Sequence, residues 1–167
     1  MRTVSGQLKQ LFVELDQRVE ALNQTRKVEG SFPLSKSKVQ LLGQMSLLAN
    51  ERVSMILWLA QTGDMDALLS MDGIVKEELK NVLKRQGFIY DEDSHLIWTP
   101  PGTKFEALFD LKNVLVEAID AESALVSKAV KAPEKNKQLI REAIAADEFP
   151  TLVDRILRHG GKLENFL

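Results

Sequence analysis

The sequence contains no cysteine, which excludes disulfide bonds, thiolate zinc sites and cysteine nucleophiles. It has no apolar run near the roughly 18 residues that a membrane span needs, and its start, MRTVSGQLKQLFVELDQ, lacks the core of a signal peptide. A formal net charge of −2 gives little overall attraction to nucleic acid or anionic lipid. We therefore expect a cytoplasmic protein without membrane contact, in which any nucleic-acid binding depends on a local patch.

Catalytic signatures are equally scarce. The two histidines, His95 and His159, lack the spacing of metal ligands, and Ser94 beside His95 is no catalytic triad. The segment GGK at 160–162 lacks the other residues of a phosphate-binding loop. The acidic run at 91–93 is not followed by calcium-loop spacing. The sequence thus predicts no catalytic residue, no metal and no cofactor, in a protein that is not an enzyme.

Most of the chain shows the three- and four-residue spacing of apolar side chains that predicts amphipathic helices. With 167 residues, 44% of them hydrophobic and 28% charged, it is long enough for one domain with its own core. Glycine and proline separate most of the predicted helices. We expect helices at residues 4–27, 36–49, 50–62, 64–71, 75–86, 103–131, 133–146 and 152–157. The predicted fold class is mainly α.

The stretch GFIYDEDSHLIWTPPG, residues 87–102, departs from this helical pattern. Two β-favouring runs, 88–90 and 96–99, flank the polar residues 91–95, and a connection of that length is normal for a hairpin. The Pro-Pro-Gly that follows prevents a strand or helix from continuing. The sequence predicts a two-stranded hairpin here; a helical bundle with residues 88–99 as a loop is the alternative.

The order of three helices and a hairpin, with Gly73 between the second and third helices, is that of a winged helix-turn-helix. The segment VLKRQGFIYDEDSHLIWTPPGTKFEALF resembles MarR-type regulators, whose recognition helix ends at a glycine, here Gly87. Thr99 and Gly102 match the step that opens the next long helix, and ILWLAQTGDMDALLSM is similar to the two preceding helices. The resemblance covers roughly residues 48–110.

This resemblance implies a dimeric DNA-binding transcription regulator in three parts. Residues 48–102 would form the winged helix-turn-helix domain, flanked by dimerisation helices in 1–47 and 103–167. The recognition helix would then present a basic face to double-stranded DNA. Its candidate residues are Lys76, Lys80, Lys84 and Arg85. The interleaved Glu77 and Glu78 suit a merely solvated helix face as well.

The predicted wing has the opposite charge to the one DNA would select. Its residues are Asp91, Glu92, Asp93, Ser94 and His95, and only the histidine can become cationic. An acidic wing instead suits docking to a basic protein partner. The alternative function is therefore a winged-helix protein–protein interaction module that does not bind DNA.

A leucine seam on the first helix predicts a homodimer. The seam comprises Leu8, Leu11, Leu15 and Leu22. The predicted helix at 103–131 offers a complementary stripe in Phe109, Val116 and Ile119, while packing of the seam within its own chain would leave a monomer. Trp58 and Trp98 suit either a ligand pocket or the core.

Overall fold

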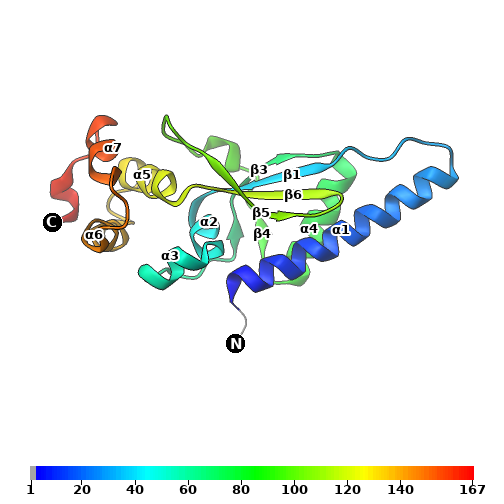
Figure 1. Cartoon of the computed structure of the whole chain (residues 1–167), viewed down its shortest axis with the longest axis horizontal. Coiled ribbons are helices and arrows are strands. Elements are labelled where there is room, and N and C mark those ends of the chain that lie inside the picture. Colours follow the sequence, from blue (N-terminus) through cyan, green and yellow to red (C-terminus); the bar gives the residue numbers. More distant parts are fainter. Residues whose placement is uncertain (1–2) are drawn as a thin grey trace.

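The chain folds as an α/β protein, so the predicted mainly α winged-helix class is wrong. The computed structural model describes residues 3–167 (Figure 1). The helices are α1 (Val4–Val28), α2 (Gly43–Ala49), α3 (Glu51–Ile56), α4 (Gly73–Arg85), α5 (Ala121–Lys131), α6 (Lys137–Ala146) and α7 (Leu152–Arg158). The strands are β1 (Ser37–Leu41), β2 (Asp64–Met65), β3 (Ala67–Ser70), β4 (Ile89–Tyr90), β5 (Phe105–Asp110) and β6 (Val114–Ile119). Short 3₁₀ turns span Ser94–Leu96 and Leu163–Phe166.

A four-stranded mixed sheet in the order β3-β1-β6-β5 forms the centre of the molecule. The two inner strands, β1 and β6, are parallel, with Val39 opposite Val116. The outer strands run antiparallel to their neighbours. Because β1 and β6 are parallel, their carboxyl ends lie at the same edge of the sheet.

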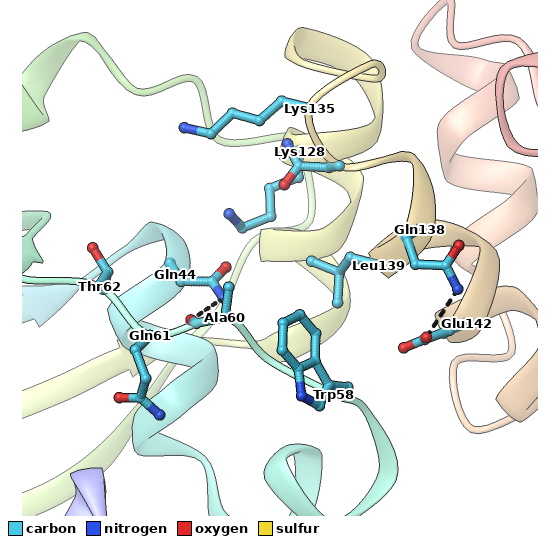
Figure 2. Close-up of a pocket in the computed structure, with 11 residues that line it drawn as sticks. Gln44, Trp58, Ala60, Gln61, Thr62, Lys128, Lys135, Gln138, Leu139 and Glu142 are labelled. Atoms are coloured by element: carbon cyan, nitrogen blue, oxygen red, sulfur yellow. Dashed lines mark hydrogen bonds between the residues drawn. The ribbon is translucent and has the colours of Figure 1, made fainter.

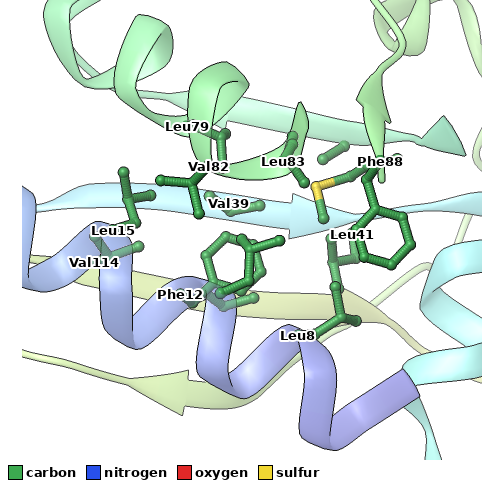
Figure 3. Close-up of a cluster of buried hydrophobic side chains, with 14 of the residues drawn as sticks. Leu8, Phe12, Leu15, Val39, Leu41, Leu79, Val82, Leu83, Phe88 and Val114 are labelled. Atoms are coloured by element: carbon green, nitrogen blue, oxygen red, sulfur yellow. The ribbon is translucent and has the colours of Figure 1, made fainter. Parts of the chain in front are cut away.

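Helices α1 and α4 cover one face of this sheet (Figure 1). The apolar side of α1 meets alternate residues of β1 and β6, including Val39 and Val114, and the apolar stripe of α4 (Figure 3). Leu8, Leu11 and Leu15 of the predicted dimer seam are fully buried in this core, and Leu22 is half-buried. The chain thus covers most of the seam itself, and homodimerisation stays a prediction without an assigned surface.

A second hydrophobic core lies beyond the sheet edge. Helices α2, α3, α5, α6 and α7 contribute to it, together with the C-terminal Phe166. Leu42 and Ile119, which follow or end the two parallel strands, also belong to this core. The carboxyl ends of β1 and β6 therefore lie at the junction of the two cores.

Several predicted helices contain strands. Residues 36–49 divide into β1 and α2, residues 64–71 carry β2 and β3, and the predicted long helix at 103–131 begins with the hairpin of β5 and β6. Alternating burial along β1 and most of β6 shows why: apolar runs such as VLVEAI face a sheet core with period two. The predictions at 4–27, 75–86 and 152–157 agree closely with α1, α4 and α7.

The predicted wing is not formed in residues 87–102. β4 pairs in parallel with β2, while residues 96–99 contain no strand. The polar residues between them form turns instead: the Asp91 carboxylate accepts the Asp93 N–H, and Ser94 Oγ donates to the Asp91 carbonyl at 2.6 Å. Such side-chain turns compete with strand formation, and here they outweigh the β propensity.

Within residues 3–167, every helix is too short or too polar to span a bilayer.

Arg155 of α7 joins the C-terminal helices to one another. Its guanidinium lies 3.0 Å from the Glu122 carboxylate and donates to Ser123 Oγ at 2.8 Å and to the Pro101 carbonyl at 3.2 Å. The Arg155 and Glu122 side chains are only 13% and 15% exposed. This ion pair is therefore shielded from solvent on both sides.

Replacing Arg155 with methionine should lower the free energy of unfolding by about 2 to 3 kcal/mol, because Glu122 keeps a largely buried charge without its ion-pair partner. Arg158→Met is the matched control: Arg158 is exposed on the same helix, and its loss should change stability by less than about 0.5 kcal/mol. Urea denaturation of both variants measures the difference. Equal effects would contradict a specific role for Arg155.

Candidate functional site

A cleft opens at the carboxyl ends of β1 and β6, between the two cores. Its first lobe is a cavity of about 320 Å³. One wall carries Asp64, Asp66 and Asp91, and the other carries Lys128 and other residues of α5 and of the loop after it. Groups of opposite charge thus line the two walls of one cavity.

The carboxylates reach this wall through strand geometry. In the sequence Asp64-Met65-Asp66 the side chains alternate, so that Met65 is buried while both aspartates point outward. The β2–β4 pairing places Met65 opposite Tyr90, and the Asp91 N–H donates to the Met65 carbonyl at 2.9 Å. The residues that follow each strand, Asp66 and Asp91, are therefore neighbours.

The crowding of the three carboxylates is reflected in the pKa of Asp66. Its pKa is raised from 3.8 to about 6, first by burial and then by a hydrogen bond to Asp91 and the charges of Asp91 and Asp64. Lys128 opposes the shift from the facing wall. The three aspartates thus carry more negative charge than their surroundings balance, and a bound cation would reduce the repulsion between them.

Gly43, which starts α2, allows Asp66 to approach the backbone closely. Its φ of 56° lies in the left-handed region, and a Cβ placed on it would lie 2.8 Å from Asp66 Oδ2. Any larger residue would strain the backbone and displace this carboxylate. Glycine at this position is therefore a requirement of the site.

Gly43→Ala should weaken the binding of a divalent cation about tenfold or more, because the new methyl group displaces Asp66, and should destabilise the fold by about 1 to 2 kcal/mol. Calorimetric titration and thermal unfolding measure the two effects. Gly73→Ala is the control, since a Cβ there has open space and Gly73 lies away from the cleft. Unchanged binding in Gly43→Ala would show that Asp66 does not need its present place.

The facing wall is basic. Helix α5 begins directly after β6 and carries Lys128 and Lys131, and Lys135 follows in the loop before α6. Burial, followed by the positive charge of Lys135, lowers the pKa of Lys128, while Asp66 opposes the change. Two neighbouring lysines in a partly enclosed space favour a bound anion.

The cleft continues into a second lobe of about 280 Å³ (Figure 2). The lobes share wall residues, among them Gln44, Lys128 and Lys135. Trp58 and Leu139 line the far part of the second lobe, and Gln44 Nε2 donates to the Ala60 carbonyl at 2.8 Å (Figure 2). Polar and apolar walls are thus continuous within one cleft.

The residues predicted to face DNA lie on α4, outside this cleft, and three of them take part in ion pairs. Lys76 and Lys80 lie 2.9 Å and 3.0 Å from the Glu92 carboxylate. Arg85 lies 2.8 Å from Glu14 of α1, and Lys84 is exposed. Much of the predicted basic face is therefore neutralised within the chain.

The structure separates the residues predicted as a wing. Asp91 lines the cleft, whereas Glu92 pairs with the lysines of α4. Ser94 is buried and accepts a hydrogen bond from the Ala67 N–H at 3.0 Å. Asp93 and His95 are exposed. Only one member of the predicted acidic tip therefore belongs to the cleft.

The prediction from sequence missed Asp64, Asp66 and Lys128. Two aspartates on alternate positions, followed by the apolar run ALL, were a usable signal, because in a strand both side chains share one face. The helical interpretation of residues 64–71 hid it. Lys128 gave no such signal, since only the tertiary fold brings it opposite the aspartates.

Within residues 3–167, no three histidine, aspartate or glutamate side chains converge as a ready-made metal cage. The carboxylates of the cleft wall suit Mg²⁺ better than a tightly held structural metal. Magnesium sites commonly use one or two carboxylates, with water and substrate phosphates supplying the other ligands. The aspartates of the cleft fit that pattern.

Comparison of the chain with protein-family models, curated proteins and solved structures gave no match.

Proposed function

We propose that the cleft binds a nucleoside triphosphate with Mg²⁺ and transfers a phosphoryl or nucleotidyl group from it to an acceptor, which releases the nucleoside diphosphate or pyrophosphate respectively. The observation that carries this proposal is the pairing of two crowded charge groups of opposite sign across one cavity. The aspartates favour a cation and the lysines favour an anion. A magnesium polyphosphate complex supplies both at adjacent positions.

The place of the cleft supports the same proposal. In open α/β sheets, ligands bind in the crevice outside the carboxyl ends of the parallel strands. The cleft occupies that position relative to β1 and β6. The volumes of its two lobes, about 320 and 280 Å³, suit a ligand of nucleotide size when they are filled together.

The chemistry divides between the two walls. A bound divalent cation would polarise the phosphoryl group and neutralise charge that develops on it. Asp66 and Asp91, which share a hydrogen bond, would hold and orient the cation, while Lys128 and Lys135 would contact phosphate oxygens. Positioning and charge stabilisation of this kind account for most of the catalysis of phosphoryl transfer.

This proposal differs from the regulator expected from the sequence. DNA binding, a protein partner and the absence of catalysis stay untested predictions. The hairpin on which the regulator rested is not formed, and Lys76, Lys80 and Arg85 are engaged in ion pairs. The cleft therefore provides the stronger basis for a function.

Calorimetric titration of the full chain with ATP tests binding. We expect affinity in the presence of Mg²⁺ and at least about tenfold weaker binding in EDTA, because the phosphates would then meet the aspartates without a cation. Incubation with ATP labelled at the α or the γ phosphate, in the presence of cell RNA and protein, tests transfer. Label from the α position identifies nucleotidyl transfer and label from the γ position phosphoryl transfer. Magnesium-independent binding, or none, would refute the proposal.

A further inference from the structure

Trp58 has no role in the proposed contacts with metal and phosphate. Its side chain is 74% exposed, although burial of a tryptophan offers one of the largest apolar gains in a small domain. Among the described residues, it belongs to neither hydrophobic core. The ring lines the second lobe of the cleft, close to Leu139 (Figure 2).

The backbone holds Trp58 in this exposed position. Leu57 is extended, with φ −115° and ψ 144°, and successive side chains alternate in an extended segment. Leu57 is buried and Leu59 packs against the second core, so Trp58 between them points away from it. The hydrogen bond from Gln44 to Ala60 ties the same segment to α2. The packing of the two leucines and this hydrogen bond therefore fix the backbone that holds the ring exposed.

The second lobe is continuous with the wall that carries Lys128 and Lys135. Lys128, Lys135, Thr62 and Gln44 line both lobes. A triphosphate held by the two lysines, with its cation at the aspartates, therefore extends toward the second lobe through its sugar. A flat aromatic ring and a leucine line the space that the attached base would enter (Figure 2).

We infer that Trp58 is the stacking platform for the nucleobase of the bound nucleotide, with Leu139 beside it in the same lobe. This inference rests on the proposed function and adds the part of the ligand that the metal and the lysines do not recognise. Stacking on an aromatic ring discriminates little among bases, because every base has a π face. We therefore expect ATP, GTP, CTP and UTP to bind within about tenfold of one another.

Calorimetry with the full chain separates base from phosphate recognition. The probes are the magnesium complexes of the four nucleotides and of inorganic tripolyphosphate. The parent protein should bind the nucleotides about 10- to 100-fold more tightly than tripolyphosphate, the usual range for one stacked base. Trp58→Ala should remove this difference while leaving tripolyphosphate affinity unchanged, and Trp58→Phe should retain most of it.

Met55→Ala is the matched control. Met55 is 87% exposed near Trp58 and shares a neighbouring hollow with it, but does not line either lobe of the cleft. Nucleotide affinity should not change in this variant. A second readout uses Trp98→Phe, which leaves Trp58 as the sole tryptophan: ATP should quench its fluorescence and tripolyphosphate should not.

The outcomes distinguish the two proposals. If the parent binds tripolyphosphate but nucleotides bind no more tightly, or if Trp58→Ala leaves nucleotide affinity unchanged, the stacking inference is refuted while the proposed function stands. Such results would favour a protein partner for the surface that Met55 and Trp58 share. Loss of tripolyphosphate binding in Trp58→Ala would also refute the inference, because it would show a structural role. A parent protein that binds neither probe refutes both proposals.

Discussion

Replacing Asp66 with asparagine is expected to weaken the binding of magnesium tripolyphosphate at least about 100-fold, which corresponds to roughly 2.7 kcal/mol. Asp66 is partly buried in the cleft, where burial raises its pKa. The amide replaces a charged ligand by a neutral one. Calorimetric titration at pH 7.5 measures the loss. Asp93→Asn removes a nearby exposed carboxylate that does not line the cleft, and should bind like the parent.

The same substitution should stabilise the protein without ligand at pH 7.5. The pKa of Asp66 is about 6 in the folded protein and 3.8 as its ordinary value, so the folded state holds the proton more tightly. This tighter proton binding raises the free energy of unfolding. The gain is fully present below pH 3.8 and is lost as the pH rises through about 6. Because Asp66 is only half-buried, we expect a gain of about 1 kcal/mol for Asp66→Asn at pH 7.5.

Urea denaturation at pH 7.5 and at pH 4 checks this sign. The stabilisation by Asp66→Asn should be largest at the higher pH and should shrink toward zero at pH 4, where the parent carboxyl is mostly protonated. A variant that is less stable than the parent at pH 7.5 would show that ionised Asp66 does not destabilise the folded protein. A site that is destabilised until its ligand arrives is common at functional positions.

Leu15→Asp is expected to unfold the protein. Leu15 is fully buried in the core formed by α1, the sheet and α4 (Figure 3). The change loses about 1.5 to 3 kcal/mol of burial and places an unpaired charge in an apolar site. Together these effects exceed about 4 kcal/mol, a large part of the 5 to 15 kcal/mol typical of a whole domain.

Circular dichroism and light scattering measure the result, with Gln17→Asp as a control on the exposed side of the same helix. We expect helicity to collapse in Leu15→Asp and to persist in Gln17→Asp. A Leu15→Asp variant that stays helical, with a mass that halves relative to the parent, would instead restore the dimer seam predicted from the sequence. The experiment therefore also tests the oligomeric state.

The elements predicted correctly are those whose periodicity is unambiguous. Helices α1, α4 and α7 have one apolar side each and lie where expected. The segment VLVEAI, by contrast, has too short an apolar run to separate a buried strand from a buried helix. Its state depends on pairing with the adjacent β5 in a hairpin and with β1, far away in the sequence. The pairing with β1 is not encoded in any local pattern.

The cleft was missed for a related reason. Its carboxylates come from two short strands that exist because they pair with each other, so their outward direction depends on tertiary contacts. The lysines lie more than 60 positions further along the chain than Asp64 and Asp66. The predicted wing failed differently, because the turn-forming side chains of Asp91 and Ser94 outweighed the flanking β propensity.

The parallel pairing of β1 with β6 also has a consequence for how the protein folds. It joins residues 37–41 to residues 114–118. The second edge of β1 therefore stays unpaired until most of the chain has been synthesised. During synthesis, that edge emerges early and remains open to pairing with other chains. The strand that precedes Gly43 thus keeps one edge open until β6 has been synthesised, and a chaperone that covers β1 until then would protect the part of the sheet that borders the cleft.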